Sequence, residues 1–308
     1  MICSIATIFI CFIIVTLDGV VLDVRRHPNW RLLEHVECGI SLADRIIGGS
    51  NATLGQYPWL ARIGYVDDSD SEVDSEVDIT FKCAGSLINR IYVLTAAHCV
   101  DNESDDSYIA IIRLGEHNAL TEIDCEEGIC AEPVQDFRPT QLIVHKHYDQ
   151  PAYKNDIALI RLNRPAIYND WVQPICIPFG DQLVKSYEGV TAEVAGWGLY
   201  NLSSPLLSDY LRFVRMPILG NEICRYYLQS YADIGPTQIC AGGVIGKDSC
   251  GGDSGAPMVK PEANHGFPRY YIIGIVSFGA EECGDSDMPG VYTRLASYVP
   301  WILNNISK

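Results

Sequence analysis

The chain has 308 residues, a formal net charge of −17 and an ordinary mixture of apolar, aromatic and charged residues. It is long enough to bury one large core or two modest ones. The negative charge argues against nucleic acid as a partner, because phosphate binding needs Lys and Arg to displace counterions. The same charge suits solubility or a basic partner.

The amino terminus has the pattern of a secretion signal. Residues 5–17 are almost wholly apolar, and the first charged residue is Asp18. A membrane span needs about 20 residues, so this run is closer to a signal core. We therefore expect a signal peptide over residues 1–19 and a secreted protein without membrane association. A retained signal anchor and a buried helix are the alternatives.

The cysteines agree with export. An even number in an exported chain indicates disulfides, and the absence of a Cys-x-x-Cys pair argues against the alternative, a metal site. Ten cysteines follow the expected signal: Cys38, Cys83, Cys99, Cys125, Cys130, Cys176, Cys224, Cys240, Cys250 and Cys283. Glycosylation sequons at Asn51, Asn102, Asn201 and Asn305 are compatible with a secreted surface.

Short β-rich runs separated by turns follow residue 46. They cover residues 59–65, 91–94, 109–114, 141–144, 157–162, 192–194 and 270–276, and several are rich in Val and Ile. Many short strands with regular turns indicate an all-β sandwich or a pair of barrels. Helical spacing appears clearly at the end of the chain, where Val299, Ile302, Leu303 and Ile306 recur.

Three motifs carry residue types suited to nucleophilic catalysis. His98 lies in TAAHC, Asp156 in NDIAL and Ser254 in GDSGAP. Singly, each has an ordinary structural interpretation as a buried histidine, a turn aspartate or a turn serine. Together, in the order His, Asp, Ser that chymotrypsin also has, they favour a catalytic interpretation.

From Ile46 to about Ile306 the chain resembles the trypsin/chymotrypsin family of serine endopeptidases. The marks of this resemblance are RIIGG (45–49), CAGSLI (83–88), TAAHC (95–99), NDIAL (155–159), GWG (196–198), GDSGAP (252–257), SFG (277–279) and PGVY (289–292). It implies an all-β fold of two six-stranded antiparallel barrels, with the active site between them and a C-terminal helix. The departures are Ala84, Phe278 and Gly251, where Gly, Trp and a larger residue are usual.

The resemblance also implies catalytic roles that chemistry explains. Ser254 would attack the scissile carbonyl, and His98 would take its proton. Asp156 would fix the tautomer of His98 and stabilise its cation. The backbone N–H groups of Gly252 and Ser254 would bind the oxyanion.

A specificity pocket for Arg and Lys is implied as well. Asp248 lies where trypsin-like members carry the charge at the base of the pocket, and a substrate cation would remove the cost of burying it. Ser249 would add a hydroxyl to the lining. Ser277, Gly279 and Gly290 would form walls that leave the pocket open. A surface turn is the alternative interpretation of Asp248.

The family organisation further implies a zymogen. Its parts are a signal peptide (1–19), a propeptide or light chain (20–45) and a trypsin-like protease domain (46–308). A trypsin-like activating protease, or the enzyme itself, would cut after Arg45. The new α-amino group of Ile46 would then pair with Asp253 and order the oxyanion loop.

The family's disulfides provide a further comparison. They imply the pairs Cys83–Cys99, Cys224–Cys240, Cys250–Cys283 and Cys38–Cys176, which leaves Cys125 and Cys130 to close a small loop. The tether formed by Cys38 resembles arthropod clip-domain cascade proteases, although residues 20–45 are too short for a clip domain.

These features favour an extracellular cascade protease that cuts protein substrates after Arg or Lys. A serpin-type inhibitor is a further expected partner. A digestive trypsin, a non-catalytic homologue that acts by binding and a structural surface protein are the alternatives.

Two acidic loops allow further functional interpretations. Glu116, Asn118, Thr121 and Asp124 lie where related proteases hold structural calcium, a metal that prefers oxygen ligands. A solvated loop is the alternative, and no cofactor is expected for catalysis. Residues 67–78 contain seven carboxylates and are expected to be extended and solvated. An exosite for a basic substrate segment is the alternative.

Overall fold

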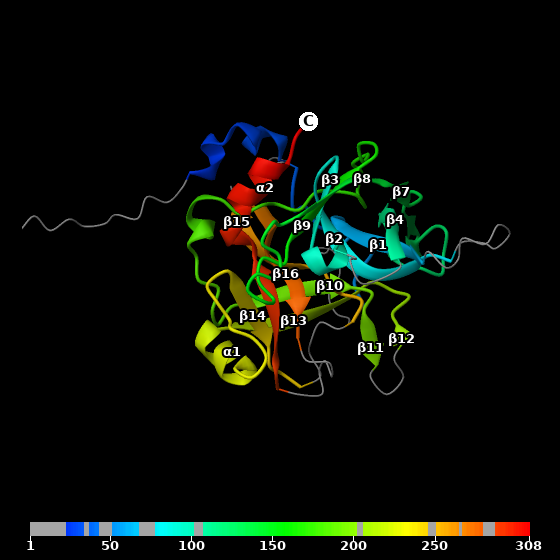
Figure 1. Cartoon of the computed structure of the whole chain (residues 1–308). Coiled ribbons are helices and arrows are strands. Elements are labelled where there is room, and N and C mark those ends of the chain that lie inside the picture. The colour runs from blue at the N-terminus through cyan, green and yellow to red at the C-terminus, as the bar shows by residue number, and fades with distance from the viewer. Residues whose placement is uncertain are drawn as a thin grey trace, which may run out of the picture.

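The computed structural model describes residues 23–33, 37–42, 51–67, 78–101, 107–201, 206–245, 251–264, 267–279 and 287–308. Two antiparallel sheets lie side by side in Figure 1, the amino-terminal sheet on the right. The described residues exclude the expected signal, Arg45, Ile46, Asn102, Asp248, Ser249, Cys250, Cys283 and residues 68–77 of the acidic insertion.

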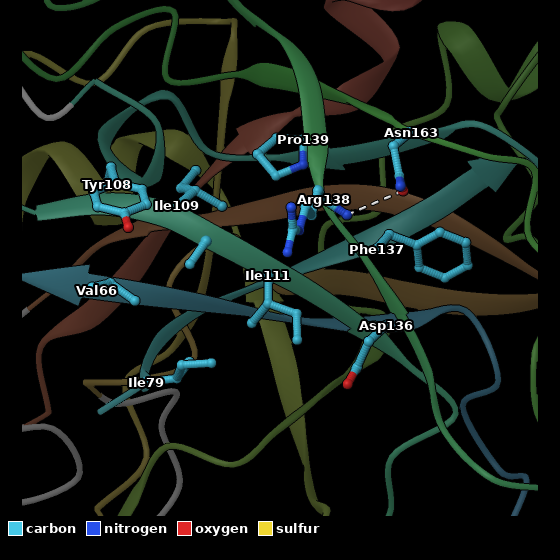
Figure 2. A pocket seen from close by; sticks show the side chains of 11 residues that line it. Val66, Ile79, Tyr108, Ile109, Ile111, Asp136, Phe137, Arg138, Pro139 and Asn163 are labelled. Carbon is cyan, nitrogen blue, oxygen red and sulfur yellow. Dashed lines mark hydrogen bonds between the residues drawn. The ribbon is translucent and has the colours of Figure 1, made fainter. Parts of the chain in front are cut away.

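The amino-terminal sheet has seven strands in the order β7-β4-β1-β2-β3-β9-β8. Strands β7 and β8 are the two edge strands of this sheet, and in the chain only Arg138 lies between them (Figure 2). The sheet is therefore curled so that its two edges lie close together at Arg138. The strands are β1 (Leu60–Asp67), β2 (Thr80–Asn89), β3 (Tyr92–Thr95), β4 (Ser107–Leu114), β7 (Gln135–Phe137), β8 (Pro139–Val144) and β9 (Ala158–Leu162).

This sheet differs in detail from the closed six-stranded barrel expected from the sequence. Strand β4 pairs with β7 only at Ile112, Arg113 and Leu114. The pairing of β4 with β1 shifts between Gly64 and Tyr65, which leaves Ala110 without a partner in β1. Such a bulge bends and twists its strand. The amino-terminal half of β4 therefore stays open on the side facing β8.

The carboxy-terminal sheet closes into a six-stranded barrel in the order β10-β13-β14-β17-β16-β15. The two-barrel type of fold expected from the sequence is confirmed by this arrangement. The strands are β10 (Thr191–Gly196), β13 (Arg212–Leu219), β14 (Gln238–Gly242), β15 (Pro257–Asn264), β16 (Phe267–Phe278) and β17 (Pro289–Arg294). Two small hairpins are formed by β5 (Cys125–Glu126) with β6 (Ile129–Cys130), and β11 (Leu199–Asn201) with β12 (Leu206–Leu207).

Helices are short. The expected C-terminal helix is present as α2 (Val299–Asn305), whereas α1 (Asn221–Leu228) was not expected. Cys224 and Leu228, four residues apart, bury one face of α1. Its other face carries exposed Ile223 and Tyr226, which obscure the amphipathic pattern in the sequence. None of the helices in the described part of the chain combines the length and apolar character that crossing a membrane requires.

The segment before the expected cleavage site is packed into the fold. Val24 and Leu33 are buried in the large core cluster. The amide of Asn29 donates to the carbonyls of Leu303 and Ile306, at 2.9 Å each, and so satisfies free carbonyls at the end of α2. Figure 1 shows this segment, in blue, beside α2, in red.

Four of the five disulfides implied by the resemblance are present. They join Cys38 to Cys176, Cys83 to Cys99, Cys125 to Cys130 and Cys224 to Cys240. The first connects the amino-terminal segment to the chain between the two sheets. The fifth pair lies outside the described residues.

Candidate active site

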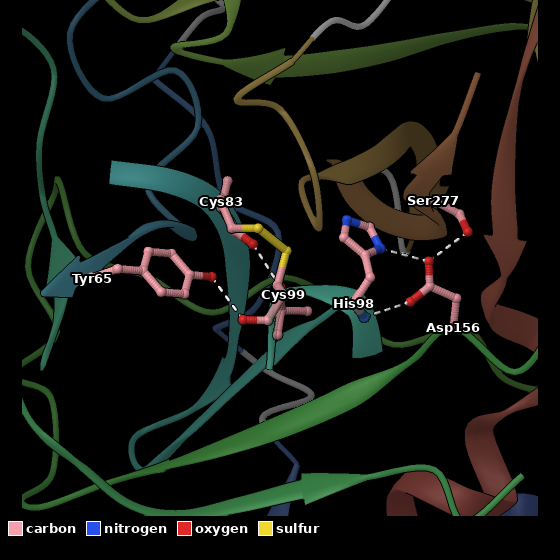
Figure 3. The surroundings of a disulfide bond; sticks show 8 residues. Tyr65, Cys83, His98, Cys99, Asp156 and Ser277 are labelled. Carbon is pink, nitrogen blue, oxygen red and sulfur yellow. Dashed lines mark hydrogen bonds and ion pairs between the residues drawn. A yellow bond between two sulfur atoms is a disulfide. The ribbon is translucent and has the colours of Figure 1, made fainter. Parts of the chain in front are cut away.

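His98 and Asp156 come together because they flank neighbouring strands. The 3-10 helix Ala97–Cys99 follows β3, and Asp156 lies just before β9. Strands β3 and β9 are paired, with Thr95 opposite Ala158. The Nδ1 atom of His98 lies 2.8 Å from Oδ2 of Asp156, and the backbone N–H of His98 donates to Oδ1 at 3.0 Å (Figure 3).

The Asp156 residue is 3% exposed, and both of its carboxylate oxygens accept hydrogen bonds. The Ser277 hydroxyl donates to its Oδ2 at 2.5 Å. Burial alone would raise the pKa of Asp156, but hydrogen bonds from His98 and Ser277 lower it below its ordinary value. An ionised carboxylate only accepts hydrogen bonds, so the Nδ1 atom of His98 carries the proton. The lone pair of Nε2 is then available to act as a base.

The Ser254 loop packs directly against the end of the amino-terminal sheet. The backbone N–H of Ala84 donates to the carbonyl of Ser254 at 2.8 Å. Gly255 has φ of +77°, and a Cβ atom there would collide with the Thr95 hydroxyl and the Ala84 carbonyl. Glycine therefore permits this close approach. Thr95 is three residues before His98, so the contact brings the serine loop beside the candidate base.

No hydrogen bond joins the Ser254 hydroxyl to His98 among the interactions of the described residues. Catalytic hydrogen bonds are often long without substrate and tighten in the Michaelis complex. The candidate oxyanion donors lie on the same loop. Gly252 has φ of +96°, and a Cβ atom there would lie 2.8 Å from Cδ2 of Leu207 and 3.0 Å from Cα of Gly198.

Asp253 is held by the end of β10. Its carboxylate accepts from the backbone N–H of Gly198 at 2.8 Å. A Cβ atom at Gly196 or Gly198 would collide with the Asp253 side chain, so two glycines leave the space that this carboxylate occupies. The expected partner, Ile46, lies outside the described residues.

The expected pocket walls face one another. A Cβ atom at Gly279 would lie 3.6 Å from Cα of Gly290, which shows how closely the two backbones approach. One neighbour of these walls was not expected from the sequence. The ring of Tyr153 stacks on Phe278 with centroids 4.7 Å apart, which places an aromatic pair beside Ser277. The available signal was an aromatic residue three positions before Asp156.

The residues expected to bind calcium have other partners. The Glu116 side chain is 3% exposed and lies 3.9 Å from Arg62 Nη1 and 3.4 Å from Arg113 Nη1. Asp124 accepts from the Thr121 hydroxyl at 2.5 Å and from the backbone N–H groups of His117 and Asn118. Two guanidinium groups already compensate the buried carboxylate, so this arrangement does not fit a calcium ion.

A second group with metal-like spacing is formed by Cys83, His98 and Cys99. The two sulfurs are bonded to each other, so they are not available as thiolate ligands. Of the expected glycosylation sites, Asn51 is exposed, whereas Asn305 is half-buried and donates to the carbonyl of Trp301 at 2.8 Å. Asn102 and the side chain of Asn201 lie outside the described set.

A two-barrel fold with a buried His–Asp pair and a glycine-flanked serine on a loop against the amino-terminal sheet is the arrangement of the chymotrypsin-like serine protease class. The sequence model of the Trypsin family matches residues 46–302. The chain therefore belongs to the trypsin family of serine proteases.

Similar proteins include serine proteases of arthropods. The chain is 42% identical to the CLIP domain-containing serine protease HP8 of Bombyx mori, over 92% of this chain and 75% of that protein. It is 37% identical to the Spaetzle-processing enzyme of Drosophila melanogaster, over 86% of this chain and 67% of that protein.

A solved structure has the same fold. The crystal structure of the Drosophila Grass clip serine protease of the Toll pathway matches with a TM-score of 0.72 and 33% identity. The match covers 88% of this chain and 74% of that chain. The resemblance to clip-domain proteases and the chymotrypsin-like fold expected from the sequence are both confirmed.

Replacing Ser277 with Ala should destabilise the protein in a pH-dependent way. The variant loses a hydrogen bond to the buried Asp156 carboxylate, which typically costs about 1–2 kcal/mol at neutral pH. A carboxyl whose pKa is lowered by folding stabilises the fold above its unfolded pKa of about 3.9, and this contribution is lost as pH falls through the folded value. The difference between variant and parent should therefore shrink in acid. The free energy of unfolding in urea, measured for variant and parent at neutral pH and in acid, tests this prediction. Exposed Ser186→Ala is the control. A difference in stability that does not change with pH would contradict the assignment.

Calcium should leave the midpoint of thermal unfolding unchanged. Glu116 is neutralised by Arg62 and Arg113, and Asp124 is saturated by donors from its own loop. The measurement compares the midpoint in EGTA with the midpoint in about millimolar calcium. A clear rise in calcium that the Asp124→Asn variant lacks would instead support the calcium site expected from the sequence.

Proposed function

We propose that the protein is a secreted trypsin-like serine endopeptidase, made as a zymogen and activated by cleavage after Arg45. The observation that carries the proposal is the buried Asp156 carboxylate, which binds Nδ1 of His98 at 2.8 Å and leaves Nε2 free to act as a base. Non-catalytic protease homologues usually lack the serine, and here all three residues are present.

The geometry supports acyl transfer in two steps. Ser254 attacks the carbonyl carbon while its proton passes to Nε2 of His98, and the resulting imidazolium is stabilised by Asp156. The oxyanion accepts hydrogen bonds from the N–H groups of Gly252 and Ser254. His98 then gives its proton to the leaving amine. Water, activated by the same imidazole, hydrolyses the acyl-enzyme and restores Ser254.

A cascade role is favoured over digestion by two features. The amino-terminal segment stays joined to the catalytic part through Cys38 and Cys176 and through the contacts of Asn29 with α2. Similar proteins carry names such as Melanization protease 1 of Drosophila melanogaster and Phenoloxidase-activating factor 3 of Holotrichia diomphalia. We propose an extracellular setting with an upstream trypsin-like activator and a serpin-type inhibitor.

The cleaved enzyme should hydrolyse bonds after Arg and Lys and lose this preference when Asp248 is replaced by Ser. Without the carboxylate a substrate cation enters the pocket uncompensated, at a cost of roughly 3–5 kcal/mol for breaking a buried pair. Hydrolysis of Arg and Phe peptide substrates measures the preference, and active-site titration confirms that Ser254 remains reactive. Exposed Asp170→Ser is the matched control. Equal cleavage after Phe and Arg by the parent enzyme would refute the assignment.

The Arg45→Gln chain should fold but stay inactive, because no α-amino group forms at residue 46. Pairing with Asp253 should raise the pKa of this α-amino group above its ordinary value of about 8. In the cleaved parent, activity should therefore fall at a pH above about 8, because the deprotonated amine cannot pair with Asp253. Cleavage is followed by reducing gel electrophoresis and activity by a chromogenic Arg substrate. Arg31→Gln, an exposed change in the same segment, should activate normally. Full activity of the intact Arg45→Gln chain would exclude the zymogen mechanism.

A further inference from the structure

Three residues in the loop before Asp156 have left-handed backbone conformations. Asp149, Tyr153 and Asn155 have φ angles of 55°, 62° and 58°. This region is unfavourable for residues with a side chain, and it is rarest for bulky residues such as tyrosine. Such a conformation persists only where surrounding contacts hold it, and it is found most often beside functional sites. We refer to residues 149–155 as the Tyr153 loop.

The amide of Gln238 holds the backbone of Tyr153. Gln238 lies in β14 of the carboxy-terminal barrel and is 4% exposed. Its Nε2 atom donates to the Tyr153 carbonyl at 3.1 Å, and its Oε1 atom accepts from the backbone N–H of Gly235 at 3.0 Å. Glutamine supplies this donor and this acceptor in one neutral group, which a methionine of the same length cannot do.

Gln238 is itself held by the helix that precedes it in the chain. Asn221, the first residue of α1, donates through Nδ2 to the carbonyls of Gly235 at 2.8 Å and of Gln238 at 3.2 Å. These hydrogen bonds fix the segment that joins α1 to β14. The Tyr153 carbonyl is therefore connected through one buried side chain to the carboxy-terminal barrel.

The two residues that follow Tyr153 are held from the same side. The Nζ atom of Lys154 lies 2.8 Å from Oδ2 of Asp233, and the Lys154 side chain is 18% exposed. Asn155 accepts a hydrogen bond from the Tyr298 hydroxyl at 3.0 Å. Each of the three residues before the candidate catalytic aspartate thus has a partner in the carboxy-terminal part of the chain.

The ring of Tyr153 lies beside the candidate active site. It stacks on Phe278 with ring centroids 4.7 Å apart, and Tyr153 is 47% exposed. Phe278 follows Ser277, whose hydroxyl donates to the Asp156 carboxylate (Figure 3). Both members of the aromatic pair are therefore close in the chain to residues of the candidate site, and the exposed part of the Tyr153 ring is open to a substrate chain.

Asp156 itself does not need the Tyr153 loop to keep its position. Its carboxylate accepts hydrogen bonds from His98 and Ser277, and its carbonyl accepts one from the Thr293 hydroxyl at 2.7 Å. Movement of the Tyr153 ring would therefore leave the His98–Asp156 pair in place. Loss of the hold on Tyr153 should alter how a substrate binds and leave proton transfer unchanged.

We propose that Gln238 is a positioning residue for the substrate site. Its amide keeps Tyr153 in the left-handed conformation that stacks the ring on Phe278, and apolar substrate residues next to the scissile arginine pack on the ring in this position. The assignment of substrate binding to the ring rests on the proposed function, whereas the hold of Gln238 on Tyr153 does not.

The test compares two substrates of the cleaved enzyme, an arginine ester and a peptide with apolar residues on both sides of arginine. In Gln238→Met, KM for the peptide should rise about fivefold to tenfold, as expected for one lost hydrogen bond, with kcat unchanged. Hydrolysis of the ester and the pH dependence of kcat should not change. Gln173→Met is the matched control, because the Gln173 amide also donates to a backbone carbonyl, that of Asn169, at 2.7 Å.

A double-mutant cycle separates an effect through Tyr153 from a general loss of stability. Tyr153→Ala removes the ring and should raise KM for the peptide by a similar factor. In the Tyr153→Ala background, Gln238→Met should raise KM no further, because the ring that it positions is gone. An equal effect of Gln238→Met in both backgrounds would overturn the proposal.

Asn221→Ala provides a second variant if Gln238→Met does not fold. It loosens the segment that carries Gln238 and should raise KM for the peptide about threefold in the parent, and not in the Tyr153→Ala background. If the parent cuts both substrates and none of these variants changes KM for the peptide, the inference fails alone.

Binding distinguishes the inference from the proposed function. If the parent cuts neither substrate, the proposed function fails. The Kd of the same peptide for the Ser254→Ala chain then decides the inference, because binding needs no cleavage. A Kd that rises about fivefold to tenfold with Gln238→Met supports the positioning role. An equal Kd, or no binding, overturns it.

Discussion

The arrangement of the site depends on one buried negative charge. Asp156 is removed from water between the two sheets, and such a charge is tolerated only when its oxygens are fully engaged. His98 from one sheet and Ser277 from the other supply those hydrogen bonds. The Thr293 hydroxyl adds a bond to the Asp156 carbonyl at 2.7 Å. The buried charge is therefore stabilised by hydrogen bonds from both sheets. The hydrogen bond between Asp156 and Nδ1 of His98 fixes the orientation of the imidazole.

A buried ion pair between Arg62 and Glu116 supports the site from a distance. Arg62 lies between Glu116 and the ring of Trp197, 5.2 Å from its centroid. The indole of Trp197 donates to the carbonyl of His117 at 3.3 Å, and the next residue, Gly198, holds the Asp253 carboxylate. A buried pair of this kind is strongly destabilising when one partner is removed. Glu116 is thus part of a structural connection between the sheets, and its own charge is compensated by Arg62 and Arg113.

Local sequence patterns predicted part of this structure. The motifs around His98 and Asp156 predicted two residues that the fold brings within hydrogen-bond distance of each other. The spacing of Val299 and Leu303 predicted α2. The Arg62–Glu116 pair was missed because it joins residues far apart in the chain with no shared motif. The open side of β4 was missed because Ala110, the bulged residue, has no special backbone preference. Helix α1 was not predicted because exposed tyrosines on its outer face obscure the apolar spacing of its buried face in the sequence.

The amino-terminal segment has a practical consequence for following the protein in a mixture. Its disulfide to Cys176 and its packing against α2 mean that one cut in the chain between Leu42 and Asn51 releases no fragment. Under non-reducing conditions, intact and cut molecules therefore differ in mass by only the one water that hydrolysis adds, and they should migrate together. Only reduction separates them, into a small and a large polypeptide. On a reducing gel, the ratio of the cut to the intact polypeptide measures the fraction of molecules that have been cut. This ratio does not depend on whether an inhibitor has since inactivated the cut molecules.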